Sequence, residues 1–296
     1  MKRNNPFRGL GVALVTPFKA DGTIDYEALQ RIVESLIEGG IDFLCVLGTT
    51  AETPCLTATE KQQVIDFVAR IVAKRVPILL GAGSNATAGV IEYLRTADLS
   101  QIDGLLIVTP YYNKPSQEGL YRHFVAIAES TSLPVVLYNV PGRTGVNLQA
   151  ATTLRVANSC PNVVAIKEAS GKIDQIEEIV AAAPEGFEVL SGDDAITFEL
   201  ISIGAVGVIS VIGNACPKEF SHMVRAELSG DYNTALHIHR GLSPLYKLLS
   251  VDGNPAGIKA LLAAQGKADN CLRLPLVPAT AATIEKMKQW VNTHQG

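Results

Sequence analysis

One lysine lies in a stretch of sequence that is otherwise too apolar to suit a charged side chain. Lys167 stands in the run VVAIKEAS, residues 163–170. On an extended strand alternate residues share a face, so Ala165 and Ala169 would leave space around its amine. Apolar surroundings favour the neutral amine, the form that attacks a carbonyl carbon to make an imine. The sequence therefore indicates a Schiff-base lysine; the alternative is a strand-end lysine paired with a carboxylate such as Glu168.

Polar side chains that could assist this chemistry stand at the ends of other apolar runs. Tyr138, in the segment LYNVPGRTG at 137–145, offers a phenol that can move protons as an imine forms, or is a core aromatic. Thr49 and Thr50 can donate to that phenol or to a substrate carboxylate, or they cap a helix. Arg143 can hold a carboxylate with two hydrogen bonds, or is a loop arginine without a specific role.

The residues that usually bind metals are poorly placed for it. All five histidines fall in predicted helices or the tail, and His237 and His239, two apart, face different sides of a helix. Asp193 and Asp194 could hold a magnesium ion, but no acids stand at the ends of the neighbouring strands. We therefore predict a mechanism that uses neither a metal nor a cofactor.

Short β-branched runs alternate with amphipathic stretches along most of the chain. The runs are continuously apolar, which is typical of parallel strands covered on both faces. Eight such strands, each followed by a predicted helix, favour a (β/α)₈ barrel over a doubly wound sheet, and no GxGxxG motif follows the first strand. In such a barrel the active site lies at the carboxyl ends of the strands. The predicted strands are Val12–Pro17, Phe43–Gly48, Ile78–Gly81, Gly104–Thr109, Val135–Asn139, Val163–Lys167, Glu188–Ser191 and Gly207–Val211.

The pattern changes after the eighth strand. Tyr232–Leu249, Pro255–Ala264 and Ala281–Thr293 read as three helices without intervening strands. We therefore predict a catalytic barrel over residues 1–230 and a C-terminal helical subdomain over residues 231–296.

Composition narrows the class of protein. The chain has 296 residues, 47% of them hydrophobic and 18% charged, with a formal net charge of −4, which argues against binding to nucleic acid. No run of 18 or more apolar residues predicts a membrane span, and the short apolar run near the start reads as a strand and not as a signal peptide. The five scattered cysteines form no CxxC pair, so we expect a reduced, cytoplasmic protein.

Several motifs together carry a resemblance to a known family. They are LGTTAE (47–52), GAGSNAT (81–87), VTPYYNKPSQEGLYRHF (108–124), LYNVPGRTG (137–145), IKEASG (166–171), LSGDD (190–194) and GVISV (207–211). Over essentially its whole length, including the helical tail, the chain resembles the dihydrodipicolinate synthase family, within the N-acetylneuraminate lyase superfamily.

The resemblance implies a reaction and a role for each matching residue. Lys167 would form an imine with pyruvate, and the enamine would condense with L-aspartate 4-semialdehyde to give 4-hydroxy-tetrahydrodipicolinate, the step that opens diaminopimelate and lysine biosynthesis. The implied proton relay is Tyr138, Thr49 and Tyr112, with Tyr112 supplied by a neighbouring subunit of a homo-oligomer, a dimer of dimers. The implied substrate contacts are Thr50 with the pyruvate carboxylate, Arg143 with the semialdehyde carboxylate, and Gly192 and Ile209 lining the pocket.

Two alternatives stay open at this stage. Sialic-acid lyases and keto-deoxy-sugar aldolases resemble the chain at the lysine and tyrosine, but they do not typically carry the PxRTG form that includes Arg143. A non-catalytic barrel that senses a metabolite is a different class, but it would have no need of an imine-forming lysine.

The resemblance also implies a regulatory pocket, and here the sequence departs from the lysine-inhibited members. Gly89 stands where they carry a glutamate that would pair with the ammonium group of lysine, and Lys61 would add a like charge. We therefore predict weak lysine binding or none; the alternative is that Glu52 or Glu60 takes over the role of the glutamate. The residues of this degenerate pocket are Thr53, Pro54, Ala58, Lys61, Asn85, Gly89 and Tyr111.

Overall fold

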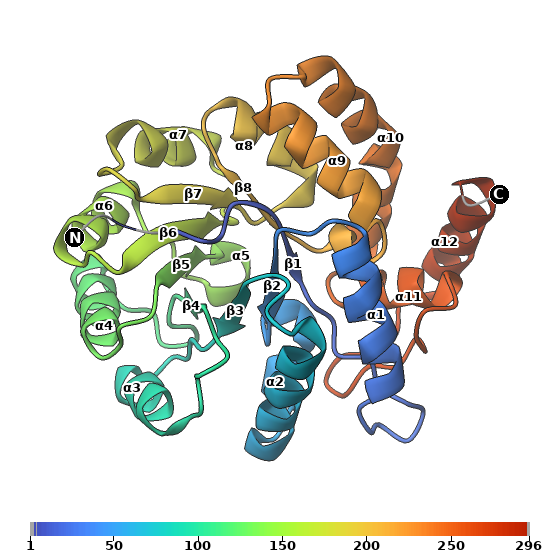
Figure 1. Cartoon of the computed structure of the whole chain (residues 1–296), viewed down its shortest axis with the longest axis horizontal. Helices are drawn as coiled ribbons and strands as arrows, with labels where there is room; N and C mark the ends of the chain where they lie inside the picture. The colour runs from blue at the N-terminus through green and yellow to red at the C-terminus, as the bar shows by residue number, and fades with distance from the viewer. Residues whose placement is uncertain (1–2, 4, 295–296) are drawn as a thin grey trace. The chain divides into compact units, whose positions relative to one another are not determined.

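The computed structural model describes residue 3 and residues 5–294. Eight parallel strands follow one another in chain order around a closed barrel, with a helical segment after each (Figure 1). The predicted (β/α)₈ fold is confirmed. The strands are β1 (Gly9–Ala13), β2 (Phe43–Val46), β3 (Ile78–Gly81), β4 (Gly104–Val108), β5 (Val135–Asn139), β6 (Val163–Glu168), β7 (Glu188–Ser191) and β8 (Gly207–Ser210).

The chain packs as two compact units. The first contains the residues up to Gly9 together with Pro77–Ile209, and the second contains Leu10–Val76 and the residues from Ser210 onward. The three C-terminal helices thus share a unit with the first two strands. The predicted division at residue 230 into a barrel and a subdomain stays a prediction.

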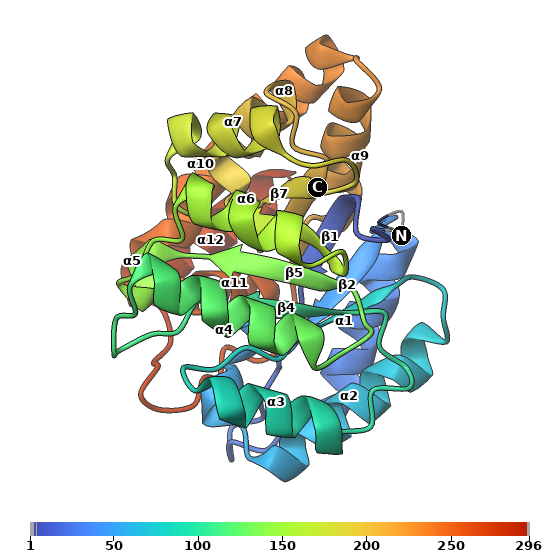
Figure 2. The same cartoon turned by 90° about the vertical axis from the view of Figure 1, so that its left-hand side faces the viewer.

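The first unit holds the strands from β3 to β8. Each pairs in parallel with the next, and the β5–β6 register sets Tyr138 opposite Lys167 and Asn139 opposite Glu168. Figure 2 shows α4 and α6 side by side, and α6 packs against β6, α4 and α7. The helical elements are α3 (Thr87–Thr96), α4 (Gln117–Glu129), α5 (Pro141–Thr144), α6 (Ala150–Ser159), α7 (Ile173–Ala182), η3 (Asp194–Ile196) and α8 (Thr197–Ser202).

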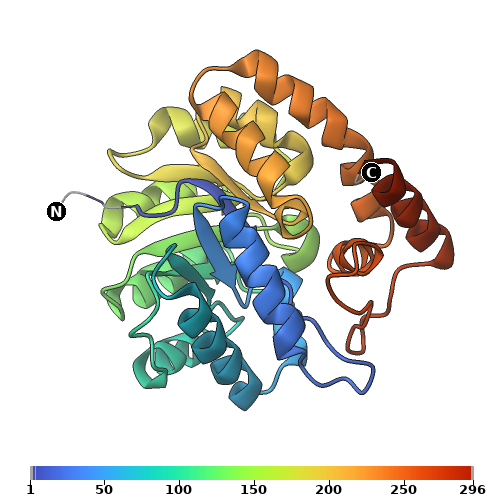
Figure 3. The same ribbon diagram turned by 45° about the vertical axis from the view of Figure 1, so that its right-hand side comes forward.

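The second unit holds β1, β2 and the helices that accompany them. Asp25 and Thr57 are N-caps, and Thr57 forms a reciprocal capping box with Glu60. Figure 3 shows α9 and α10 side by side, with α11 and α12 following them in red. The helical elements are α1 (Tyr26–Glu38), η1 (Thr49–Ala51), η2 (Thr53–Cys55), α2 (Ala58–Val72), η4 (Ile212–Asn214), α9 (Pro217–Leu228), α10 (Tyr232–Val251), α11 (Ala256–Ala264) and α12 (Ala281–His294).

The first strand begins and ends three to four residues earlier than the predicted Val12–Pro17. Glycine is a weak strand former, so sequence reasoning missed Gly11, but a Cβ there would lie 2.2 Å from the ring of Phe43 on β2, and only glycine fits. At the other end the N–H of Val15 donates to the side-chain oxygen of Asn214 (3.2 Å) and so leaves the strand ladder. The apolar run extends past the end of the strand and stays buried in the core, because a residue can be buried without belonging to a strand.

None of the helices within residues 3 and 5–294 has both the length and the apolar character needed to cross a membrane.

Candidate active site

Lys167 and Tyr138 lie together inside the first unit. They are register partners on β6 and β5, and their exposed fractions are 5% and 6%. The Lys167 Nζ atom lies 4.5 Å from the centroid of the Tyr138 ring, within the range of a cation–π contact. The amine is therefore buried beside an aromatic side chain that carries an ionisable hydroxyl, which is the arrangement that imine chemistry needs.

Gly192, directly after β7, provides the space beside this lysine. A Cβ at Gly192 would lie 3.1 Å from Cε of Lys167 and 2.7 Å from Cβ of Ala169. The N–H of Gly192 also donates to the carbonyl oxygen of Glu168 (2.7 Å), so its backbone cannot move away. Both Lys167 and Ala169 therefore face Gly192, in agreement with the two-residue alternation along the strand.

Glu168 lies on the other face of β6, away from Lys167. Its fully buried carboxylate accepts hydrogen bonds from Asn139 Nδ2 (2.5 Å), Ser170 Oγ (2.5 Å) and Gln175 Nε2 (3.5 Å). The alternative in which Lys167 simply pairs with Glu168 is therefore wrong. Burial raises the pKa of Glu168 to about 7, although these three hydrogen bonds oppose the shift.

This buried carboxyl should make the stability of the protein depend on pH. Because the pKa is about 7 in the folded protein and near 4.5 in the unfolded chain, the folded state binds the proton more tightly. The contribution is fully present below pH ~4.5 and is lost as the pH rises through ~7. Relative to Glu168→Gln, the wild-type protein should lose up to about 3 kcal/mol of unfolding free energy between pH ~5 and pH ~8.5.

Urea unfolding of both proteins at the two pH values measures this difference. Glu178→Gln, which changes an exposed carboxylate on the same helix as Gln175, is the matched control and should follow the wild type. A difference between wild type and Glu168→Gln that stays constant across the pH range would contradict the assignment.

Arg143 stands on a short helix, whereas the alternative reading of the sequence placed it in a loop. It is the third residue of α5, and its side chain is exposed. The segment is anchored, because the buried Thr144 hydroxyl accepts a hydrogen bond from Thr109 Oγ1 (3.2 Å) and the N–H of Leu148 donates to Asn139 Oδ1 (2.9 Å). Gly145 ends the helix at φ +69°, a left-handed conformation that favours glycine. The guanidinium thus projects from a fixed turn.

Two tyrosines follow β4 in the first unit and face solvent. Tyr111 is 38% exposed and Tyr112 is 86% exposed, and Tyr112 has φ +73°, which is uncommon for a residue with a bulky side chain. The carbonyl oxygen of Tyr111 accepts a hydrogen bond from Asn85 Nδ2 (3.5 Å), so those two predicted pocket residues lie together. Ile209, by contrast, is buried in β8.

Thr49 and Thr50 belong to the second unit, directly after β2. They begin η1; Thr50 is 1% exposed and Thr49 is half-buried. Thr50 Oγ1 accepts a hydrogen bond from Asn254 Nδ2 (3.0 Å), a contact that sequence reasoning missed because the two residues are 204 positions apart. The only sequence signal was that Asn254 follows a predicted helix and precedes a proline.

The other predicted pocket residues are on or near the surface. Thr53 and Pro54 lie in η2, Ala58 and Lys61 in α2, and Gly89 is an exposed residue of α3. The alternative that Glu52 or Glu60 replaces the missing glutamate meets a physical obstacle, because Glu52 pairs with Lys259 and Glu60 pairs with Arg273. The guanidinium lowers the pKa of Glu60 to about 2.

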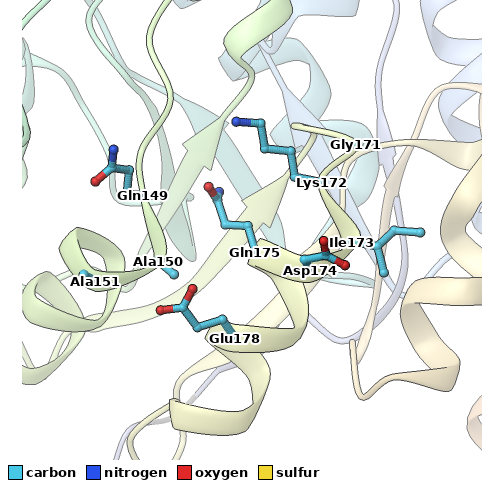
Figure 4. Close-up of a pocket in the computed structure, with 9 residues that line it drawn as sticks. All are labelled: Gln149, Ala150, Ala151, Gly171, Lys172, Ile173, Asp174, Gln175 and Glu178. Carbon is cyan, nitrogen blue, oxygen red and sulfur yellow. The ribbon is translucent and has the colours of Figure 1, made fainter.

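A surface hollow of about 690 Å³ lies in the first unit, and it contains none of the predicted site residues. Figure 4 shows that Gln149 and Ala150 reach it from the start of α6, while Gln175 and Glu178 come from α7 and Lys172 directly precedes that helix. The hollow is thus on the helical side of β6, near the Gln175 amide that contacts Glu168. Among the described residues, no group of three or more histidines, cysteines or acids is placed to hold a metal ion.

Comparison with known proteins places this geometry in a family. Residues 6–294 match the model of the Dihydrodipicolinate synthetase family. The chain belongs to this family. It is 57% identical to the 4-hydroxy-tetrahydrodipicolinate synthase of Phocaeicola vulgatus over 96% of each chain.

Solved structures of the family have the same fold. The dihydrodipicolinate synthase of Thermotoga maritima is similar with a TM-score of 0.95 at 43% identity, covering 98% of this chain and 99% of that one. The chloride-inhibited dihydrodipicolinate synthase of Acinetobacter baumannii, described as complexed with pyruvate, is similar with a TM-score of 0.93 at 40% identity, covering 96% of this chain and 98% of that one. The family resemblance seen in the motifs is confirmed.

Proposed function

We propose that this chain is a 4-hydroxy-tetrahydrodipicolinate synthase that condenses pyruvate with L-aspartate 4-semialdehyde through a Schiff base on Lys167. The observation that carries the proposal is the buried Lys167 amine beside the Tyr138 ring, in a chain that is 57% identical to a synthase of that name.

The reaction runs through three covalent stages. The neutral Lys167 amine attacks C2 of pyruvate, and loss of water gives the imine. Loss of a proton from C3 gives an enamine, whose C3 forms a bond to the aldehyde carbon of the semialdehyde. The amino group of the semialdehyde then attacks C2, displaces Lys167 and closes the ring. Each stage moves at least one proton, and we assign that transfer to Tyr138; its position beside the amine supports the assignment.

The remaining roles are proposed from the family motifs. Thr49 and Tyr112 complete the proton relay, Thr50 binds the pyruvate carboxylate, and Arg143 binds the semialdehyde carboxylate. Gly192 and Ile209 line the pocket. The space that Gly192 leaves beside Cε of Lys167 supports its role.

We also propose that the protein acts in the cytoplasm as a homo-oligomer, a dimer of dimers, and the exposure of Tyr112 supports a subunit interface. An aromatic side chain that is 86% exposed is costly to leave in water and typical of a protein interface. In the proposed assembly Tyr112 serves the neighbouring subunit.

Trapping with borohydride tests the function. Pyruvate and borohydride together should inactivate the protein and leave one reduced pyruvate on Lys167, mapped by peptide mass spectrometry. The purified protein should then use aspartate semialdehyde in preference to sugar aldehydes. Faster turnover of sugar aldehydes would replace the proposal with the aldolase, and no adduct on any lysine would favour a metabolite sensor.

We further predict that lysine does not inhibit this enzyme at physiological concentration. An amino-acid ligand needs an acid for its ammonium group, and Gly89 offers none. Glu52 and Glu60 are held by Lys259 and Arg273, so neither can serve without breaking an ion pair. Initial rates measured at rising lysine concentration should stay constant; clear inhibition below ~1 mM would show that the binding energy comes from elsewhere.

A further inference from the structure

Helix α11 of the C-terminal tail reaches the turn that follows β2 at two points. Asn254, two residues before α11, donates to the hydroxyl oxygen of Thr50 (3.0 Å). Lys259, in the fourth position of α11, forms an ion pair with Glu52, two residues after Thr50. All of these residues belong to the second unit. The start of α11 and the segment just before it therefore hold the turn by two different interactions, one within η1 at Thr50 and one at Glu52, which follows η1.

The ion pair is deeply buried. The exposed fractions of the Lys259 and Glu52 side chains are 2% and 0%, and Lys259 Nζ also donates to the carbonyl oxygen of Cys271 (2.9 Å) and lies 4.1 Å from the Phe18 ring centroid. Burial lowers the pKa of Lys259, and the charge of Glu52 opposes that shift. A buried pair is a poor source of net stability, because the desolvation of both charges offsets their attraction. We therefore expect the ion pair to matter for the position of the turn after β2 and not for the stability of the fold.

The backbone of the turn needs such support. Glu52 links η1 to η2 with φ +55° and ψ +36°, a left-handed conformation that is unfavourable for a residue with a side chain. The second carboxylate oxygen of Glu52 accepts from the N–H of Arg273 (3.0 Å), and the Arg273 guanidinium donates to Glu60 and to the carbonyl oxygen of Gly22. The side chain of Glu52 is thus fixed at both oxygens, and with it the turn that carries Thr49 and Thr50.

The Asn254 contact also determines whether the Thr50 hydroxyl donates or accepts in its other hydrogen bonds. A hydroxyl has one hydrogen to donate, and its oxygen accepts. Because Asn254 Nδ2 is a donor, the Thr50 oxygen is the acceptor in this bond, and its hydrogen remains available for another partner. A carboxylate accepts hydrogen bonds and cannot donate them, so this orientation suits the recognition of an acid.

We propose that Asn254 and the Lys259–Glu52 pair are positioning residues, which hold the Thr50 hydroxyl as a preorganised donor to the carboxylate of the 2-oxo acid substrate. This proposal rests on the proposed function, in which Thr50 binds the carboxylate of pyruvate. It gives the C-terminal helices a part in substrate recognition. Neither Asn254 nor Lys259 touches the substrate; both act through the turn.

Asn254→Ala tests the hydrogen bond. The loss of a hydrogen bond that aligns a donor to a charged group should raise the KM for pyruvate roughly three- to tenfold. The KM for aspartate semialdehyde should change by less than about twofold, because the carboxylate of that substrate is assigned to Arg143. Gln265→Ala is the matched control, since Gln265 is an amide at the other end of α11 that donates to the carbonyl oxygen of Ala215 (3.2 Å) and not to the turn.

The double variant Glu52→Gln with Lys259→Met tests the ion pair without leaving one buried charge unpaired. It too should raise the KM for pyruvate selectively, and its folding is checked by circular dichroism and gel filtration. Lys267→Met is its control, because Lys267 donates to the carbonyl oxygen of Ala215 and does not contact Glu52.

The outcomes separate the two proposals. If the wild-type protein forms no reduced adduct with pyruvate, the proposed function fails, and the positioning role that rests on it fails as well. If the wild type forms the adduct and Asn254→Ala keeps its pyruvate KM within about twofold, the positioning role is wrong. An equal rise in both KM values, or the same rise in Gln265→Ala, also overturns it, because a general loosening of the fold then explains the result.

Discussion

Lys167→Ala should reduce turnover by several orders of magnitude while the protein still folds. The amine is the nucleophile in the proposed mechanism, and without it neither imine nor enamine forms. Lys167 is buried beside the Tyr138 ring, and among the described residues no carboxylate forms an ion pair with it. Its removal therefore leaves no unpaired buried acid, and the lost activity reports on chemistry and not on stability. The steady-state rate with both substrates measures the effect.

The adduct gives an independent measurement of the same prediction. Lys167→Ala should take up no reduced pyruvate, whereas Lys247→Ala, which removes an exposed lysine on α10, should be labelled like the wild type. Lys167→Arg is informative as well, because a guanidinium keeps the positive charge but stays protonated and cannot attack a carbonyl. Labelling of Lys167→Ala at another lysine would show that the nucleophile had been misassigned.

The sequence predicted the barrel well because local patterns determine it. Continuous apolar runs marked all eight strands, and β3, β5 and β7 have the predicted bounds. The two-residue alternation on β6 also predicted that Lys167 and Ala169 share a side, which the neighbouring Gly192 bears out. Motifs then identified the family, as the match over residues 6–294 confirms.

Features that depend on contacts distant in sequence could not be predicted. Nothing near Asn254 in the chain points to Thr50, and Glu52 and Lys259 pair across more than 200 positions. Glu168 looked like a partner for its neighbour Lys167, but adjacent strand residues face opposite ways, and its partners Asn139 and Gln175 come from elsewhere in the fold. Polar residues in buried positions are satisfied by whichever element packs on them, and that choice is made only in three dimensions.

The first strand and the Arg143 segment show a second limit on predicting secondary structure from sequence. The predicted strand at 12–17 stays apolar as far as Val15, yet β1 ends at Ala13, because the N–H of Val15 donates to the side chain of Asn214 and not to a neighbouring strand. The PGRT sequence contains proline and glycine and so read as a loop, but proline suits the first position of a helix and Gly145 its end. Element type is thus less certain for short segments, where one contact decides the conformation.

Arg143→Ala should impair the use of aspartate semialdehyde far more than the formation of the pyruvate imine. A hydrogen bond to a charged group contributes roughly 1.5–3 kcal/mol, so kcat/KM for the semialdehyde should fall by at least one to two orders of magnitude. The effect should be confined to the second substrate, because Arg143 is on α5 whereas Lys167, the proposed imine-forming residue, is on β6. Borohydride trapping with pyruvate should therefore proceed at nearly the wild-type rate.

Two further variants sharpen this test. One probes the geometry of the guanidinium, and the other is a control for the loss of an arginine from the surface. Arg143→Lys keeps the charge but offers a point donor in place of a planar fork, so it should recover only part of the lost activity. Arg122→Ala removes a side chain that is 78% exposed and pairs with Glu118 on the surface of α4, and it should leave both substrates unaffected. If Arg143→Ala slowed pyruvate trapping as much as condensation, Arg143 would serve the first substrate or the fold. If it improved the use of sugar aldehydes relative to the semialdehyde, Arg143 would be confirmed as the residue that separates this reaction from those of the related aldolases.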